Sequence, residues 1–364
     1  MIEIGDVIKV FAPTALNAAK VIFPFAVAFI IGLIIAVPLG RFLHAHKLWK
    51  KKARTEGLGD DKGTPIFHQL HKIKETNTPR MGGIVIWTSV ILTIFIFWFI
   101  PQIYSTELTE KMNFFSRSQT WLPLFTLISA SLVGLVDDIF VIKGRGKYIA
   151  GGLSLTERII AVLIIGAIGG WWFYTKLGFS SLVLPFLGTF DMGILTIPLF
   201  MFVALTLFAG GVIDGVDGLA GGVKASIFAG YAGIAFFQDQ IDLAAFSLVL
   251  SGATLAFLWY NIPPARFYMS ETGILGLTVT LAVVAFLTRQ IPVLLIIAFP
   301  IIVTVAVNVI QVASKKFRGK KVFLVAPLHH HFEAKGWPGP MVTMRYWIVS
   351  ILCALVGMVI AVLG

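Results

Sequence analysis

The sequence predicts an all-α, polytopic integral membrane protein with about ten membrane-spanning helices. Of its 364 residues, 57% are hydrophobic and 13% are charged, whereas about 25% of residues are charged in a typical soluble domain. Apolar runs close to the ~20 residues that a helix needs to cross a bilayer recur along the whole chain. We therefore expect a single integral membrane domain over residues 1–364.

The expected spans are bounded by charged residues, proline or glycine. The fifth and sixth are separated by a few residues around Asp214, and the eighth and ninth by Arg289 and Gln290. Residues 177–191 carry two glycines and a proline, which predicts an extended or hairpin excursion at the outer surface. The spans are 20–40, 82–100, 121–141, 157–175, 192–213, 218–236, 243–261, 272–288, 291–313 and 344–363.

Positive charges predict the orientation of these spans. The chain has 29 Lys and Arg against 18 Asp and Glu, a net charge of +11. Many cations fall in the two longest connections, about 41–81 and about 314–343, which the positive-inside rule places in the cytoplasm. An even number of spans then places both termini outside. This distribution indicates membrane orientation and argues against a nucleic-acid partner.

Two further features concern processing and redox state. The first residues show no basic stretch followed by a small-residue cleavage site, so no cleavable signal peptide is expected. The single cysteine, Cys353, excludes an intrachain disulfide.

Polar residues gather at the ends of spans assigned to the cytoplasmic face. A cluster on one face predicts an active site there, whereas a carrier would keep its polar residues near mid-membrane. The cluster comprises Asp137, Asp138, Asp214, Asp217, Glu271, His329, His330 and His331.

Asp137 and Asp138 end the third apolar run. A helix C-terminus repels acids, and adjacent acids are costly in lipid. The pair therefore predicts a functional site with a cation opposite, the alternative being a helix end that faces water.

The segment KIKETNTPRMGG, residues 72–83, precedes the second span. Thr78-Pro79 disfavours helix there, and Gly82-Gly83 allows close approach of backbone. Its basic side chains, among them Lys74 and Arg80, form a candidate phosphate site. Ordinary membrane anchoring is the alternative for each.

The segment GGVIDGVDGLAGG, residues 210–222, forms a sharp turn between two spans. Asp214 and Asp217 are three residues apart and would share one face of a helix. A solvated glycine-rich turn is the alternative.

The segment NIPPARFYMSETGILG begins at Asn261. Glu271 opens the next span, where the helix N-terminus favours a carboxylate whether or not it has a functional role. Tyr268 is a candidate for stacking on a flat ring, or a member of an interfacial aromatic belt.

Three consecutive histidines, His329 to His331, lie in the last long connection. Consecutive helical residues point about 100° apart, so the three are not expected to bind one metal. Lining a pocket and donating hydrogen bonds to phosphates fits them better. A zinc site is the rival, and no cysteine lies nearby.

Four motifs carry a family resemblance: NTPRMGG, LVGLVDDIF, GVIDGVDGLAGG and APLHHHFEAKGWP. In their order and spacing the chain resembles the phospho-N-acetylmuramoyl-pentapeptide transferase (MraY) family, within the polyprenyl-phosphate N-acetylhexosamine-1-phosphate transferases. The resemblance covers nearly the whole chain. It implies transfer of phospho-MurNAc-pentapeptide from UDP-MurNAc-pentapeptide to undecaprenyl phosphate in a bacterial cytoplasmic membrane, giving lipid I and UMP with Mg²⁺ as cofactor. A homodimer is compatible with this assignment.

The resemblance also implies roles for the acids. Asp137 matches the first aspartate of the family pair, which deprotonates or orients the lipid phosphate, and Asp138 would support the metal–phosphate site. Asp214 is expected near the metal and the reaction, with Glu271 as a second metal ligand. The residues expected to bind substrate are Lys74, Arg80, Asp217, Asn261, Tyr268, His329, His330 and His331.

The chain also departs from the family pattern and is expected to be a divergent member. The usual metal aspartate is replaced by Glu271, which is one methylene longer. The basic residue of the second-span motif aligns with Glu75, so Lys74 is the expected substitute. The other departures are Arg80, Ile139, Gly211 and Ile213.

Two alternatives remain at this stage. A sister transferase would use UDP-GlcNAc, which the histidine loop disfavours. A non-enzymatic carrier of a lipid-linked sugar would need a polar path through the membrane, which the clustering of acids on one face disfavours.

Overall fold

The computed structural model describes residues 4–50, 77–144 and 152–364. Over these residues, ten helices are long and apolar enough to cross a membrane, which confirms the expected number of spans. The chain is an integral membrane protein. The elements are α1 (Ile4–Ala45), α3 (Ile84–Ile103), α4 (Glu107–Met112), α5 (Trp121–Ile142), α6 (Leu155–Lys176), β1 (Ser181–Leu184), β2 (Gly188–Asp191), η1 (Gly193–Leu195), α7 (Thr196–Ala209), η2 (Gly210–Ile213), α8 (Leu219–Phe237), α9 (Ile241–Asn261), α10 (Ser270–Leu287), α11 (Leu294–Ile297), α12 (Phe299–Arg318), α13 (Leu328–Ala334) and α14 (Gly339–Leu363).

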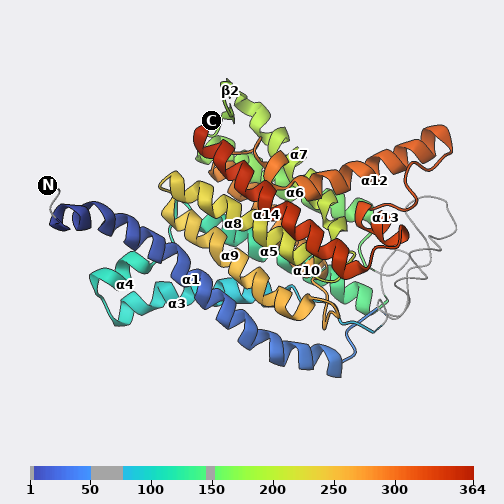
Figure 1. Cartoon of the computed structure of the whole chain (residues 1–364), viewed down its shortest axis with the longest axis horizontal. Coiled ribbons are helices and arrows are strands. Elements are labelled where there is room, and N and C mark those ends of the chain that lie inside the picture. The colour runs from blue at the N-terminus through green and yellow to red at the C-terminus, as the bar shows by residue number, and fades with distance from the viewer. Residues whose placement is uncertain (1–3, 51–76, 145–151) are drawn as a thin grey trace.

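The bundle is built around α8, α9 and α10, whose side chains are mostly buried (Figure 1). α10 packs against α5, α7 and α3, while α9 packs against α1 and α8. The outer helices expose apolar side chains, as lipid contact requires. The start of α1 and the end of α14 lie toward one end of the bundle in Figure 1, as an even number of spans requires.

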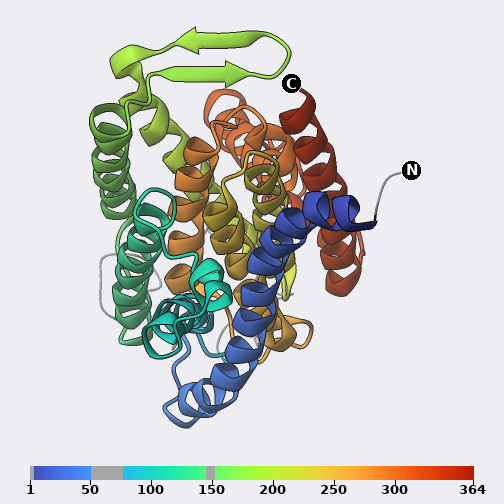
Figure 2. The ribbon, with the colours of Figure 1, turned by 90° about the vertical axis from the view of Figure 1, so that its left-hand side faces the viewer.

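A β-hairpin over residues 181–191 confirms the hairpin expected within residues 177–191. β1 pairs antiparallel with β2, with Ser181 opposite Asp191 and Leu184 opposite Gly188. Gly188 has φ +95, a conformation that glycine adopts without steric cost. The hairpin lies across one end of the bundle (Figure 2).

The ninth span differs from the expected continuous run over 291–313. The chain turns at residues 291–293, forms the short α11, and restarts as α12 after Ala298. Pro292 and Pro300 lack the N–H groups that a continuous helix would use, which explains the break. α12 then leaves the bundle (Figure 1), with Val309 and Phe317 exposed.

Two glycines bring neighbouring helices against the start of α10. A Cβ at Gly83, before α3, would lie 2.2 Å from the backbone nitrogen of Gly273. A Cβ at Gly134 on α5 would lie 2.1 Å from the carbonyl oxygen of Glu271. Backbone therefore packs on backbone at this point, which fixes the first turn of α10 between α3 and α5.

Candidate active site

The first turn of α10 is the centre of the candidate site. Asp138 and Asp214 accept hydrogen bonds from residues of this turn, and Glu271 belongs to it. Asp137 joins them through an arginine that it shares with Glu271. The structure thus brings together four of the acids that the sequence singles out.

Asp138 is fully buried and accepts five hydrogen bonds. Its Oδ1 receives Nε and Nη2 of Arg80 at 3.0 and 2.9 Å. Its Oδ2 receives Oγ of Ser270 at 2.7 Å, and the backbone nitrogen and Oγ1 of Thr272 at 2.9 and 2.6 Å. The backbone N–H is one of those that a helix start leaves unsatisfied. Asp138 therefore caps α10 from a neighbouring helix and holds Arg80 in place.

Asp137 is also fully buried, but its environment differs. Its Oδ1 accepts the backbone N–H of Leu153 at 2.7 Å, and its Oδ2 lies 3.0 Å from Nη2 of Arg158. Nη1 of Arg158 lies 2.6 Å from Oε1 of Glu271. One guanidinium therefore bridges acids from α5 and α10.

Local sequence explains where Arg158 lies. Ser154 and Glu157 form a capping box at the start of α6: Ser154 Oγ accepts the Glu157 N–H at 3.2 Å, and Glu157 Oε2 accepts the Ser154 N–H at 2.7 Å. Arg158 is the next residue. Gly152 has φ +96, and a Cβ there would lie 2.9 Å from Asp137 Oδ1. Only glycine lets this loop close over Asp137.

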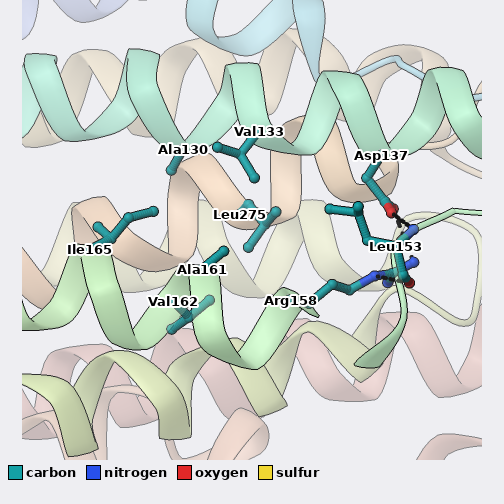
Figure 3. Close-up of a pocket in the computed structure, with 9 residues that line it drawn as sticks. All are labelled: Ala130, Val133, Asp137, Leu153, Arg158, Ala161, Val162, Ile165 and Leu275. Atoms are coloured by element: carbon teal, nitrogen blue, oxygen red, sulfur yellow. Dashed lines mark hydrogen bonds and ion pairs between the residues drawn. The ribbon is translucent and has the colours of Figure 1, made fainter. Parts of the chain in front are cut away.

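Arg158 and Asp137 lie at the polar end of a small crevice between α5, α6 and α10 (Figure 3). Apolar side chains, including Val133, Val162 and Leu275, line the rest. The crevice is therefore lined mainly by apolar side chains, and it is charged at the end that Asp137 and Arg158 form.

Asp214 and Asp217 lie in a turn between η2 and α8, not on one helix face as the spacing predicts. Gly218, at φ +78, delays the helix beyond both acids. Asp214 Oδ2 accepts the Ser270 N–H at 3.1 Å, whereas Asp217 Oδ2 accepts the Ala265 N–H at 3.3 Å. Burial raises the pKa of Asp214 to about 6, opposed by the Ser270 hydrogen bond.

Asn261 is buried and ties two loops together. Its Oδ1 accepts the Gly218 N–H at 3.0 Å and its Nδ2 donates to the Phe267 carbonyl at 2.9 Å. Tyr268 is half-buried, and its backbone pairs with Pro79 and Gly82. The expected Lys74, like Glu75, lies outside the described residues.

The histidines separate into two groups on α13. His329 and His330 are buried, with ring centroids 4.2 Å apart, and His330 Nδ1 lies 2.7 Å from Glu333 Oε2. His331 points elsewhere: its Nδ1 accepts the Leu324 N–H at 3.3 Å. Among the described residues, no three or more His, Cys, Asp or Glu side chains are grouped so that they could hold a metal ion.

Comparison with known proteins gives the family of the chain. Residues 120–289, which contain the acids of α5, the turn and α10, match the family described as glycosyl transferase family 4. A phospho-N-acetylmuramoyl-pentapeptide-transferase of Geobacillus thermodenitrificans is 35% identical over 350 residues, which cover 94% of this chain and 98% of the relative. One from Clostridium botulinum is 31% identical and covers 98% of this chain and 99% of the relative. The chain belongs to the phospho-N-acetylmuramoyl-pentapeptide-transferase family.

Two cations at the site escape the sequence reasoning. Arg158 lies in the first turn of a span, and Lys224 lies inside α8, where it is buried and its Nζ donates to Thr278 Oγ1 at 3.2 Å. Lys224 also acts electrostatically on Asp214. An ionisable residue inside a span is by itself a functional-site signal, and this signal would have found Lys224.

Gly215, between Asp214 and Asp217, provides a test of how the histidines meet the turn. A Cβ there would lie 2.5 Å from His329 Nε2 and 2.8 Å from His330 Nε2. We expect Gly215→Ala to displace the α13 loop and to lower kcat at least about tenfold, with the misplacement of site residues as the cause. UMP release measures this, and thermal unfolding in detergent shows whether folded protein is lost in general. Unchanged turnover would contradict the contact.

Proposed function

We propose that the chain transfers phospho-MurNAc-pentapeptide from its UDP carrier to undecaprenyl phosphate, with lipid I and UMP as products. The observation that carries this proposal is the gathering of Asp137, Asp214 and Glu271 with Arg158 at one end of the bundle. A reaction between two anionic phosphates needs such a mixed set, because basic groups hold phosphates and carboxylates hold a cation or orient a nucleophile. We place this end at the cytoplasmic face, on the charge distribution of the connections.

The donor set fits Mg²⁺. Carboxylate oxygens are the ligands that Mg²⁺ prefers, and proteins often bind it through one or two carboxylates together with substrate phosphates. Asp214 and Glu271 would hold it, since Asp214 accepts the Ser270 N–H and Glu271 is the next residue of α10. Among the described residues, Asp137 Oδ2 is buried and accepts no hydrogen bond, and it lies 3.0 Å from Nη2 of Arg158 in an ion pair. The cation would offset the negative charge of the nucleotide diphosphate.

The residues of the chain take distinct roles in this proposal. Asp137, at the polar end of the crevice, orients or deprotonates the acceptor phosphate. Asp138 acts indirectly, because its hydrogen bonds hold Arg80 and α10 in place. His329 and His330 lie against Gly215 of the turn and bind the diphosphate end of the donor. Lys74 keeps its proposed role as a phosphate ligand.

The nucleotide end is formed by a second group of residues. Asp217 and Asn261 support the loop at 261–268, and Tyr268 is the proposed stacking partner of the uracil ring.

The deciding experiment measures UMP released by the purified protein with undecaprenyl phosphate and UDP-MurNAc-pentapeptide. We expect release that depends on Mg²⁺ and stops with EDTA. Turnover of UDP-GlcNAc but not of the muramoyl donor would instead assign the chain to the sister transferases. Lipid movement between leaflets without UMP release would assign it to carriers.

A further inference from the structure

Arg158 contacts two carboxylates that have different proposed roles. Its guanidinium contacts the carboxylate proposed to orient the acceptor, Asp137, and a carboxylate proposed to bind Mg²⁺, Glu271, at 3.0 and 2.6 Å. Asp137 is fully buried, and the side chains of Arg158 and Glu271 are 17% and 21% exposed. A divalent cation bound by Glu271 would therefore meet a resident positive charge at close range, where repulsion is strong.

The same side chain is suited to a second position. A guanidinium presents five N–H donors in a plane and binds phosphate oxygens in pairs. Arg158 is at the polar end of the crevice, beside Asp137 and next to apolar walls (Figure 3). Because Nη2 of Arg158 lies 3.0 Å from Asp137 Oδ2, a lipid phosphate that reaches Asp137 would come within the range of this side chain.

Arg80 provides the contrast. Both of its contacts go to Oδ1 of Asp138, whose other oxygen accepts three more hydrogen bonds. Asp138 is fully buried and contributes to the start of α10, so releasing Arg80 would disrupt the fold locally. Arg158 makes its two acid contacts to carboxylates that are both proposed to act on other ligands.

We propose that Arg158 is a ligand of the acceptor's phosphate, held by Asp137 and Glu271 until a divalent cation displaces it from Glu271. This inference rests on the proposed function, because it takes a lipid monophosphate as the acceptor and Glu271 as a metal ligand. In this proposal, the ion pair between Arg158 on α6 and Glu271 on α10 is present only in the metal-free enzyme. Metal binding and acceptor binding are then coupled through one side chain.

The first measurement is Mn²⁺ affinity without substrates, read from electron paramagnetic resonance of the free ion. Mn²⁺ shares the oxygen preference of Mg²⁺. We expect Arg158→Gln to bind Mn²⁺ at least about threefold more tightly than the wild type, since the competing charge is gone. Arg117→Gln, which removes an exposed arginine that precedes α5, is the matched control and should leave the affinity unchanged.

The second measurement is the KM for undecaprenyl phosphate at saturating Mg²⁺. We expect Arg158→Gln to raise it at least about tenfold, the size of a lost charge-assisted contact, and Arg158→Lys to restore part of it. A purely structural role would lower kcat and leave this KM unchanged, and that result would overturn the proposal. Equal or weaker Mn²⁺ binding by Arg158→Gln would overturn it as well.

Arg158→Lys also serves if the glutamine variant is not monodisperse. A lysine ammonium cannot bridge both acids as the guanidinium fork does, so its Mn²⁺ affinity should exceed that of the wild type, and an equal value would contradict the competition. Because Mn²⁺ binding is measured without substrates, it is separate from the proposed function, which fails if the wild type releases no UMP from UDP-MurNAc-pentapeptide.

Discussion

The Asp137→Asn enzyme is expected to retain its fold and to lose turnover by at least about a hundredfold, the usual scale for a group that moves or orients a proton. The amide oxygen can still accept the Leu153 N–H, so the loop over α5 keeps its position. The change removes the negative charge that faces Arg158 and, in our proposal, the acceptor phosphate. UMP release and thermal unfolding in detergent measure the two effects separately.

Asp239→Asn is the matched control for this variant. Asp239 is exposed after α8 and has φ +56, a conformation that asparagine tolerates well. Its turnover should equal that of the wild type. An Asp137→Asn enzyme within about threefold of wild-type turnover would remove Asp137 from the chemistry.

The neighbouring substitution, Asp138→Asn, should act mainly on stability. It leaves the Arg80 guanidinium beside a neutral amide and places N–H groups among donors that need an acceptor. Breaking one partner of a buried ion pair costs about 3–5 kcal/mol. We expect a loss of this size in the free energy of unfolding, measured by titration of mixed micelles with a denaturing detergent.

A double variant separates the ion pair from the carboxylate alone. Asp138→Asn combined with Arg80→Gln removes both charges, so it should be more stable than the sum of the two single changes predicts. Asp239→Asn again shows the effect of an exposed aspartate. If Asp138→Asn loses less than about 1 kcal/mol, Asp138 is not the structural cap described here.

Much of the fold can be predicted from the sequence because lipid imposes a simple rule. Each span must be apolar and long, so composition locates all ten spans to within a few residues at most boundaries. The division of the ninth span at Ala298 escapes the prediction, since a hydropathy pattern does not show where proline ends a helix inside an apolar run.

The site is less accessible from sequence. Asp137 and Asp138 are adjacent and of the same type, yet one is saturated by Arg80, Ser270 and Thr272 and the other shares a single arginine. Their partners lie up to 134 residues away in the chain. Only the packing of α5 against α10 decides which acid is structural.

The same limit applies to the other motifs. Asn261 uses both ends of its amide within the protein, and His331 points away from its two neighbours. The sequence singles out these segments, but it could not show which of their atoms are already engaged.

The two glycines that pack against the start of α10 have a consequence for genetics. Because Gly83 and Gly134 let three helices touch main chain to main chain, a methyl group at either position would shift Ser270, Glu271 and Thr272 together. The clash is with main chain, so such an allele would disturb the first turn of α10 even where the span still inserts into the membrane. Screens for growth would place it among active-site lesions, although neither glycine carries a side chain that could act on a substrate.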